Sequence, residues 1–253
     1  MSIKILLWVV VLKVCFSVEC GRVKRVVGGV EVECGTQPRV ASLRNSTSLQ
    51  HLCGATVLTA ELALTAAHCV HFNHDQYLLQ LNNHCEGPPP RAHILEIIPH
   101  ASYDKASRSH DLALLRIQLE RDDITWLGDV LPQSSFGVSG QCAIYGYGTR
   151  DPLSSETSEV LMAGDVKIVS LDECTSALGP IAPAYDAGMV CALGEAMDAC
   201  QGDSGSPLIC ESAIQGISSY GLSCGVRGVP GVYTSIGPHL TWIRDVIRKS
   251  NIV

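Results

Sequence analysis

The chain has 253 residues, of which 46% are apolar and 17% charged, and this composition argues against a disordered protein and for one or two compact domains. Its formal net charge is −7, and residues 1–25 hold five basic residues and one acidic residue, so the remainder carries 13 basic against 24 acidic residues. Such an acidic surface argues against nucleic acid and anionic membranes as partners and favours cationic substrates. Twelve cysteines are many for a cytosolic protein and indicate an oxidising compartment.

Residues 1–17 have the pattern of a secretory signal peptide. Lys4 precedes an apolar run over residues 5–12, and small residues lead up to the expected cleavage after Ser17. The alternative is a membrane anchor, but Lys13 interrupts the run, which falls short of the ~20 residues that a membrane span needs. The pattern therefore predicts a secreted, extracellular protein.

Residues 18–25 end in the basic tetrapeptide Arg-Val-Lys-Arg, and the apolar Val26 follows directly. A dibasic end of this kind suits proteases of the secretory pathway as well as trypsin. We therefore expect residues 18–25 to be an activation propeptide that is removed by cleavage between Arg25 and Val26. The alternative interpretation is a basic linker without a role.

From Pro38 onward, short apolar runs alternate with turn residues, which is typical of an all-β protein built as a barrel or a sandwich. Near the C-terminus, four apolar residues fall on one face of a helix: Leu240, Ile243, Val246 and Ile247. The predicted strands cover residues 40–43, 54–58, 77–81, 112–117, 143–147, 166–169, 207–210, 215–219 and 231–234.

A polar loop after the first predicted strand contains an N-glycosylation sequon, Asn45-Ser46-Thr47. In a secreted protein this sequon predicts a glycan on Asn45. Three consecutive prolines, at positions 88–90, indicate a rigid surface loop.

Three short motifs carry the chemistry. Ser204 lies in the sequence Gly-Asp-Ser-Gly, where the glycines allow a tight turn that exposes the hydroxyl. A serine hydroxyl is a poor nucleophile unless a base takes its proton. His68 supplies such a base, and Asp111, at the start of an apolar strand, can orient it. A polar Gly-Ser turn alone is common, so the prediction rests on the three motifs together.

These motifs, in the chain order His, Asp, Ser, resemble the trypsin/chymotrypsin-like serine proteases, and the similarity spans nearly the whole chain from Val26 to the C-terminal helix. The resemblance implies an all-β fold of two six-stranded antiparallel β-barrels with a C-terminal α-helix. The protease domain would cover residues 26–253, with barrels at roughly residues 26–132 and 133–253 that meet near residues 131–140. The active site would lie between the two barrels.

The resemblance also implies the mechanism, which is a general template for serine proteases. Ser204 would attack the scissile carbonyl, and His68 would take its proton and later give one to the leaving amine. Asp111 would orient His68, and the N–H groups of Gly202 and Ser204 would hold the oxyanion. The expected partners of such a monomeric enzyme are polypeptide substrates, protein protease inhibitors and an activating protease, without a cofactor.

Two other classes of function compete with this one. A catalytically silent homologue that only binds would normally lack a member of the triad, and here all three are present. An esterase or lipase with the same chemistry would normally carry a Gly-x-Ser-x-Gly elbow on an α/β fold, and here the order of elements differs.

The resemblance places Asp198 at the floor of the substrate pocket, where a carboxylate favours an Arg or Lys side chain. Its neighbour Ala199 lacks a hydroxyl to complete the coordination of a lysine ammonium, whereas arginine can meet Asp198 with two parallel hydrogen bonds. We therefore expect a preference for Arg over Lys of about tenfold. The remaining pocket residues would be Gln201, Ser219, Tyr220, Gly221 and Gly231.

Three positions depart from the family pattern. Tyr147 and Tyr220 stand where tryptophan is usual, and Ser206 replaces a more usual glycine. Because tyrosine keeps a flat aromatic face, we expect retuned subsites and retained activity.

In the resembled family, cleavage before a segment such as Val26-Val27-Gly28-Gly29 frees an ammonium that inserts into the protein. Here this ammonium would pair with Asp203 and order the oxyanion loop around Gly202. An unpaired buried carboxylate is unfavourable and a paired one can be held in place, so the pairing can act as a switch.

The resemblance implies four disulfides, Cys53–Cys69, Cys142–Cys210, Cys174–Cys191 and Cys200–Cys224. Cys15 would leave with the signal peptide, and three further cysteines depart from the usual pattern. Cys34 can bridge Cys85 and leave Cys20 unpaired, or Cys20 can join one of them and tether the propeptide. We favour the Cys34–Cys85 bridge.

The sequence predicts no metal site. Calcium prefers several oxygen ligands, and residues 82–91 offer only Glu86 as a carboxylate. Pro230 stands where sodium-regulated members of the family tend to carry an aromatic residue. Four possible zinc ligands are close in sequence but lack a standard spacing: His71, His74, His84 and Cys85.

Overall fold

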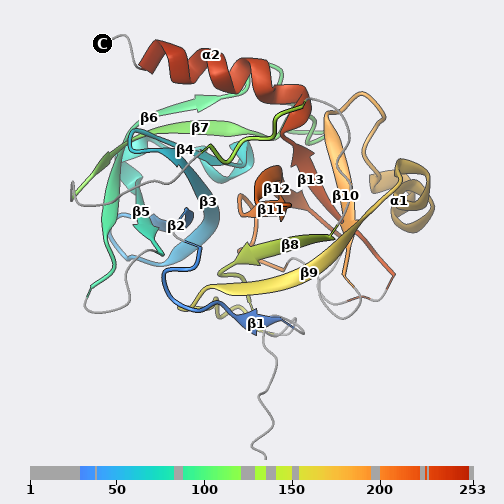
Figure 1. Ribbon diagram of the computed structural model, residues 1–253, viewed down its shortest axis with the longest axis horizontal. Coiled ribbons are helices and arrows are strands. Elements are labelled where there is room, and N and C mark those ends of the chain that lie inside the picture. Colours follow the sequence, from blue (N-terminus) through green and yellow to red (C-terminus); the bar gives the residue numbers. More distant parts are fainter. Residues whose placement is uncertain are drawn as a thin grey trace, which may run out of the picture.

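Two β-barrels lie side by side in the computed structural model, which describes residues 29–37, 39–82, 88–120, 129–134, 141–149, 154–194, 200–222, 226 and 228–250 (Figure 1). The first barrel is closed by six antiparallel strands in the order β2-β3-β4-β7-β6-β5. These strands are β2 (Val40–Asn45), β3 (His51–Thr59), β4 (Leu62–Thr65), β5 (Tyr77–Leu81), β6 (Arg91–Pro99) and β7 (Ala113–Leu119).

The second barrel also has six strands and closes because β8 pairs with both β9 and β11. Its strands are β8 (Gln141–Gly146), β9 (Met162–Val169), β10 (Met189–Leu193), β11 (Pro207–Cys210), β12 (Ala213–Tyr220) and β13 (Gly231–Ser235). A short strand that precedes the first barrel, β1 (Val30–Glu31), pairs with β9 of the second. The first segment of the described chain is therefore tied to the far half of the molecule.

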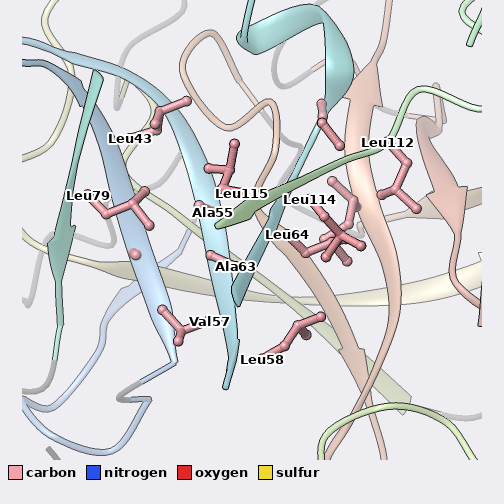
Figure 2. Close-up of a cluster of buried hydrophobic side chains, with 14 of the residues drawn as sticks. Leu43, Ala55, Val57, Leu58, Ala63, Leu64, Leu79, Leu112, Leu114 and Leu115 are labelled. Carbon is pink, nitrogen blue, oxygen red and sulfur yellow. The ribbon is translucent and has the colours of Figure 1, made fainter. Parts of the chain in front are cut away.

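Leucine side chains fill the first barrel. Leu43, Leu64, Leu79 and Leu114 come from four different strands and are fully buried, and Figure 2 shows them converging on one interior. Burying each such side chain stabilises the fold by roughly 1.5–3 kcal/mol. The barrel is thus a packed core that holds the loops at its rim.

The C-terminal helix α2 (Leu240–Ser250) extends this core. Leu240 and Ile243 are buried in the same cluster as the first-barrel leucines, and Val246 and Ile247 pack against it. Figure 1 shows the helix lying along the first barrel beside β6 and β7. The predicted fold of two six-stranded barrels with a C-terminal helix is confirmed.

All nine predicted strands are present, with ends that differ by up to four residues. The strand expected at residues 112–117 begins at Ala113, which leaves Asp111 in the loop before it. The prediction did not include β1, β4, β6, β10 or the helix α1 (Leu171–Leu178). This helix begins with a capping box, in which Ser170 Oγ accepts from Glu173 N and Glu173 Oε2 accepts from Ser170 N.

Three disulfides join described cysteines, and they are three of the four pairs that the resemblance implied. Cys53–Cys69 ties β3 to the turn after β4, Cys142–Cys210 joins the neighbouring strands β8 and β11, and Cys174–Cys191 fastens α1 to β10. Cys34 and Cys200 are also disulfide-bonded, to cysteines outside the described residues. Their pairing with Cys85 and Cys224 stays a prediction.

The predicted signal peptide, the propeptide and the Arg25–Val26 cleavage site lie outside the described residues, as does most of the predicted junction at residues 131–140. In the part of the chain that the structure describes, no helix combines the length and the apolar character needed to cross a membrane.

Candidate active site

His68 and Asp111 form a doubly bonded pair at the rim of the first barrel. His68 lies on a 3-10 turn, Ala67–Cys69, which the Cys53–Cys69 disulfide fastens to β3. Its Nδ1–H donates to Asp111 Oδ2 at 2.6 Å, and its backbone N–H donates to Asp111 Oδ1 at 2.9 Å. The two bonds fix both the position and the ring orientation of His68.

The second barrel contributes to the same pair through Ser219 of β12. Its hydroxyl donates to Asp111 Oδ2 at 2.5 Å. Burial would raise the pKa of Asp111, but the hydrogen bonds from His68 and Ser219 outweigh it and hold that pKa below its usual value. Asp111 is therefore ionised at neutral pH and keeps the proton of His68 on Nδ1, which leaves Nε2 as an acceptor.

Ser204 lies in the turn that leads into β11. The turn is held by two backbone bonds, from Gly54 N to Ser204 O at 2.7 Å and from Gly205 N to Ser218 O at 2.8 Å. Gly205 has φ +83°, and a Cβ there would lie 2.3 Å from Gly54 O, so this position requires glycine.

Among the described residues, no hydrogen bond joins Ser204 Oγ to His68 Nε2. Catalytic hydrogen bonds are often long in a free enzyme and tighten when substrate is bound. The turn that carries the half-buried Ser204 lies against the end of β4, because a Cβ on Gly205 would be 2.4 Å from Thr65 Oγ1 and 3.3 Å from Ala66 N, two residues before His68.

The backbone N–H groups of Gly202 and Ser204 have no acceptor within the described part of the chain. Gly202 has φ +94°, and its carbonyl accepts from His51 Nε2–H at 2.8 Å. Fixing this carbonyl restrains the residue whose N–H is one of the two expected oxyanion donors. The two N–H groups are thus available to a developing negative charge.

A chain of hydrogen bonds from Arg44 through Ser42 to His51, called the relay below, orients the His51 ring. Arg44 Nε donates to Ser42 Oγ at 3.0 Å, and Ser42 Oγ lies 2.7 Å from His51 Nδ1. Because a guanidinium can only donate, the Ser42 proton points to His51 Nδ1, and His51 keeps its own proton on Nε2 for Gly202. Burial, assisted by the charge of Arg44, lowers the pKa of His51 to about 4, so the ring stays neutral. Glu159 pairs with Arg44 at 2.9 Å on the surface side.

Asp203, beside the expected nucleophile, is a buried carboxylate whose donors in the described part of the chain are backbone N–H groups alone. It accepts from Gly148 N at 2.8 Å and from Cys200 N at 2.7 Å, and no cation of the described chain lies against it. Burial raises its pKa from about 3.8 to about 6. A cavity of about 10 Å³ adjoins Asp203 and Ser206, which is roughly the volume that one water-sized group occupies.

The structure brings several of the expected pocket residues together. Gly221 follows β12 and lies against Gly231 of β13, since a Cβ built on Gly221 would be 3.9 Å from Gly231 Cα. Tyr220 is half-buried at the end of β12, and Gln201 is exposed. The expected pocket floor, Asp198 with Ala199, lies outside the described residues.

Tyr147, one of the two tyrosines that stand where the family usually has tryptophan, lies with its ring beside that of His51. It is buried, with its ring centroid 5.6 Å from that of His51, and so packs behind the oxyanion loop. Ser206 is buried as well, and its hydroxyl has no hydrogen-bond partner among the described residues.

Sequence reasoning missed Arg108, whose Nη1 lies 3.8 Å from Asp111 Oδ2. Burial raises the pKa of Tyr220, and the charge of Arg108 opposes that rise. The sequence offered one signal, a basic residue three positions before the predicted orienting aspartate. It likewise gave no sign of the relay through Arg44 and Ser42.

Other predicted positions lie away from this site. Asn45 ends β2, and its Oδ1 accepts from the backbone N–H of Thr47 and of Ser48 in an exposed turn. His71 Nδ1 and His74 Nδ1 bond to different backbone carbonyls, and His84 and Cys85 are not among the described residues.

Comparison with known proteins establishes the class of protein. The family model described as Trypsin matches residues 26–243. The chain belongs to the trypsin family and is a serine endopeptidase.

Its relatives include several kallikreins. Human kallikrein-8 is 35% identical over 237 residues, which cover 88% of this chain and 86% of the relative. Mouse kallikrein-1 is 33% identical over 244 residues, which cover 90% of this chain and 91% of the relative. Among solved structures, neuropsin, described as a serine protease expressed in the limbic system of mouse brain, is 33% identical with a TM-score of 0.75. That match covers 87% of this chain and 98% of neuropsin.

Proposed function

We propose that this protein is a secreted trypsin-like endopeptidase that cleaves after Arg, in preference to Lys, and is made as a zymogen cleaved between Arg25 and Val26. The observation that carries the proposal is the His68–Asp111 pair, locked by two hydrogen bonds and a third from Ser219, beside the Ser204 turn.

In this mechanism Ser204 Oγ attacks the substrate carbonyl while His68 Nε2 takes its proton. Asp111 stabilises the resulting imidazolium and keeps the ring in register. The N–H groups of Gly202 and Ser204 receive the oxyanion, and one such donor typically lowers the barrier by ~3 kcal/mol. His68 then protonates the leaving amine, the bond to the amine breaks, and the substrate acyl group stays on Ser204 Oγ. Water then attacks this acyl-enzyme with His68 as the base, and the acid product leaves.

The buried carboxylate of Asp203 supports the activation step. A buried anion whose donors among the described residues are backbone N–H groups only is unfavourable, and the adjoining cavity has about the volume of one ammonium group. The ammonium freed at Val26 would occupy this place and pair with Asp203. Pairing would lower the pKa of the carboxyl and hold the loop that carries Gly202.

The test is to incubate the protein, cleaved at Arg25–Val26, with an Arg ester and the matched Arg amide. We expect both to be hydrolysed, and the uncleaved chain to be far slower on both. Turnover of the ester alone would indicate an esterase, and turnover of neither would indicate a binding homologue; each result contradicts the proposal. N-terminal sequencing of secreted material checks the cleavage, which predicts Val26 as the first residue.

We expect the uncleaved chain to lose stability as the pH rises from about 4 to about 7. Asp203 has a pKa of about 6 in the folded chain and about 3.8 when unfolded, so the folded state binds more protons between these values. The contribution is fully present below pH 3.8 and is lost as the pH rises through 6, by about 3 kcal/mol. Urea unfolding of the uncleaved chain and of its Asp203→Asn variant, across this pH range, measures the difference. Parallel curves for the two proteins would contradict it, and cleavage should abolish the effect.

We expect Arg44→Met to lower kcat of the cleaved enzyme about tenfold with KM nearly unchanged, since it removes one hydrogen bond of the relay that holds Gly202. Arg44→Lys should restore part of the loss because the ammonium can still donate to Ser42. Glu159→Gln is the matched control and should change kcat less than twofold, because an exposed ion pair contributes little. A loss confined to KM, or an equal loss in the control, would refute the relay.

A further inference from the structure

Three histidines outside the catalytic machinery converge on one point. His100 follows β6, His110 immediately precedes Asp111, and His239 ends the 3-10 turn Gly237–His239 that leads into α2. One ring nitrogen of each lies within 4.8 Å of the other two. The three positions have no motif spacing in the sequence, so only the fold reveals the group.

The nitrogens of His110 and His239 already face one another. His239 Nδ1–H donates to Ser235 O at 2.6 Å, so His239 Nε2 presents a lone pair. His110 Nδ1 lies 2.9 Å from that atom and therefore carries the proton between them. If His110 holds its proton on Nε2 instead, both facing nitrogens present lone pairs, with no net gain or loss of protons.

The ring of His100 packs against the other two histidines and against the helix α2. The His100 ring stacks on His110 with centroids 5.2 Å apart and meets Trp242 edge-on at 4.9 Å. His239 is buried, whereas His100 and His110 are partly exposed, so the cluster is open on one side. A cation can enter from that side and keep a water ligand.

The charge state of the rings suits a metal, which binds neutral imidazole. Burial, with a contribution from the other two histidines, lowers the pKa of His239 to about 4. Burial and the nearby His110 also lower the pKa of His100. The Ser235 carbonyl fixes the ring of His239, as a supporting partner does for a metal-binding histidine.

We propose that His100, His110 and His239 form a zinc site, with water as the fourth ligand. Zn–N distances of about 2.0–2.1 Å in a tetrahedron place ligand nitrogens about 3.3 Å apart, which lies between the 2.9 Å of the facing pair and the 4.8 Å limit of the group. Three imidazoles suit zinc, whereas calcium and magnesium prefer oxygen ligands.

Such an ion would link β6, the loop that carries Asp111, and α2. Because it would bind the folded chain and not the unfolded one, zinc at 100 times its Kd should raise Tm by about 5 °C or more. Because His110 directly precedes Asp111 in the chain, the same link would also restrain the segment that positions Asp111.

The test uses chelator-treated full-length protein carrying Ser204→Ala, so that self-digestion and activity do not enter. Calorimetric titration with ZnCl2 should show one ion per chain with a Kd in the micromolar range, and cobalt(II) should give the absorption of a tetrahedral site. His100→Gln, at a partly exposed ring, and His110→Gln should each weaken binding at least tenfold.

Two variants serve as controls. His93→Gln removes an exposed histidine of β6 that belongs to a different contact, with Glu120, and should leave Kd unchanged. His68→Gln removes the catalytic imidazole and should also leave Kd unchanged, which separates this site from metal capture at the triad.

Unchanged zinc binding in His100→Gln and His110→Gln would overturn the proposal, as would loss of binding in His68→Gln alone. If the three histidines contribute only packing, these variants would have a lower Tm and zinc would not change the Tm of the parent. That result would also overturn the proposal. Because the readout is binding by an inactive variant, its failure would leave the proposed protease function standing.

Discussion

Ser204→Ala in the cleaved enzyme is expected to lower kcat/KM on an Arg amide by about 10⁴-fold or more, because the proposed triad would act as a unit and would lose its nucleophile. The variant should also resist covalent labelling by an organophosphorus reagent. Ser204 Oγ makes no hydrogen bond to the described residues, so its removal should leave secretion and Tm unchanged.

Ser206→Ala is the matched control for this experiment. Ser206 lies two residues further along the same turn, is buried, and has a hydroxyl without a partner among the described residues. Its truncation should preserve activity within a few fold. Turnover by Ser204→Ala comparable to that of the parent would reject the assignment of the nucleophile.

Asp198→Ser is expected to remove most cleavage after both Arg and Lys. The substrate cation would enter the pocket without a partner, at a penalty of ~3–5 kcal/mol, which corresponds to about 100- to 4,000-fold in kcat/KM. Paired substrates that differ only in Arg or Lys before the scissile bond measure the effect. The parent should favour Arg by about tenfold, and Ala199→Ser should narrow that ratio.

The control for the specificity variants is Asp186→Ser, which removes an exposed acidic residue in the loop before β10 and should leave both rates unchanged. A parent enzyme that prefers an aromatic side chain before the scissile bond would defeat the assignment of Asp198. Equal rates on Arg and Lys would defeat only the argument from Ala199.

Local patterns were sufficient to predict an all-β fold, whereas its division into two six-stranded barrels came from the resemblance to the protease family. Short apolar runs between turn residues located nine strands, and the spacing of Leu240 and Ile243 located the helix that packs on the first barrel. Strand β6 was not predicted because Glu96 interrupts its apolar residues. The register of its pairing with β7 shifts between Ile94 and Glu96. Helix α1 was not predicted because it has only eight residues, and a search for apolar periodicity does not detect its capping box.

The site was predictable only where chemistry is concentrated in short motifs. The sequence supplies the residue types of His68, Asp111 and Ser204, and the structure shows directly how the first two are locked together. The hydrogen bond from His51 to Gly202 joins residues 151 positions apart, and no local sequence pattern around either residue predicts it. Contacts of this kind depend on how the two barrels dock, which a single sequence does not reveal.

The pairing of β1 with β9 has a kinetic consequence for the proposed activation. Val30 is held against Ala163, and the adjacent Met162 lines the cavity beside Asp203. Four residues of chain span at most ~14 Å, so an amine freed at Val26 stays within that radius of its anchor. Its effective concentration near the carboxylate would be in the millimolar range or above. Activation would thus follow cleavage as a unimolecular step, independent of enzyme concentration, and a free dipeptide would have to reach comparable concentrations to replace the missing terminus.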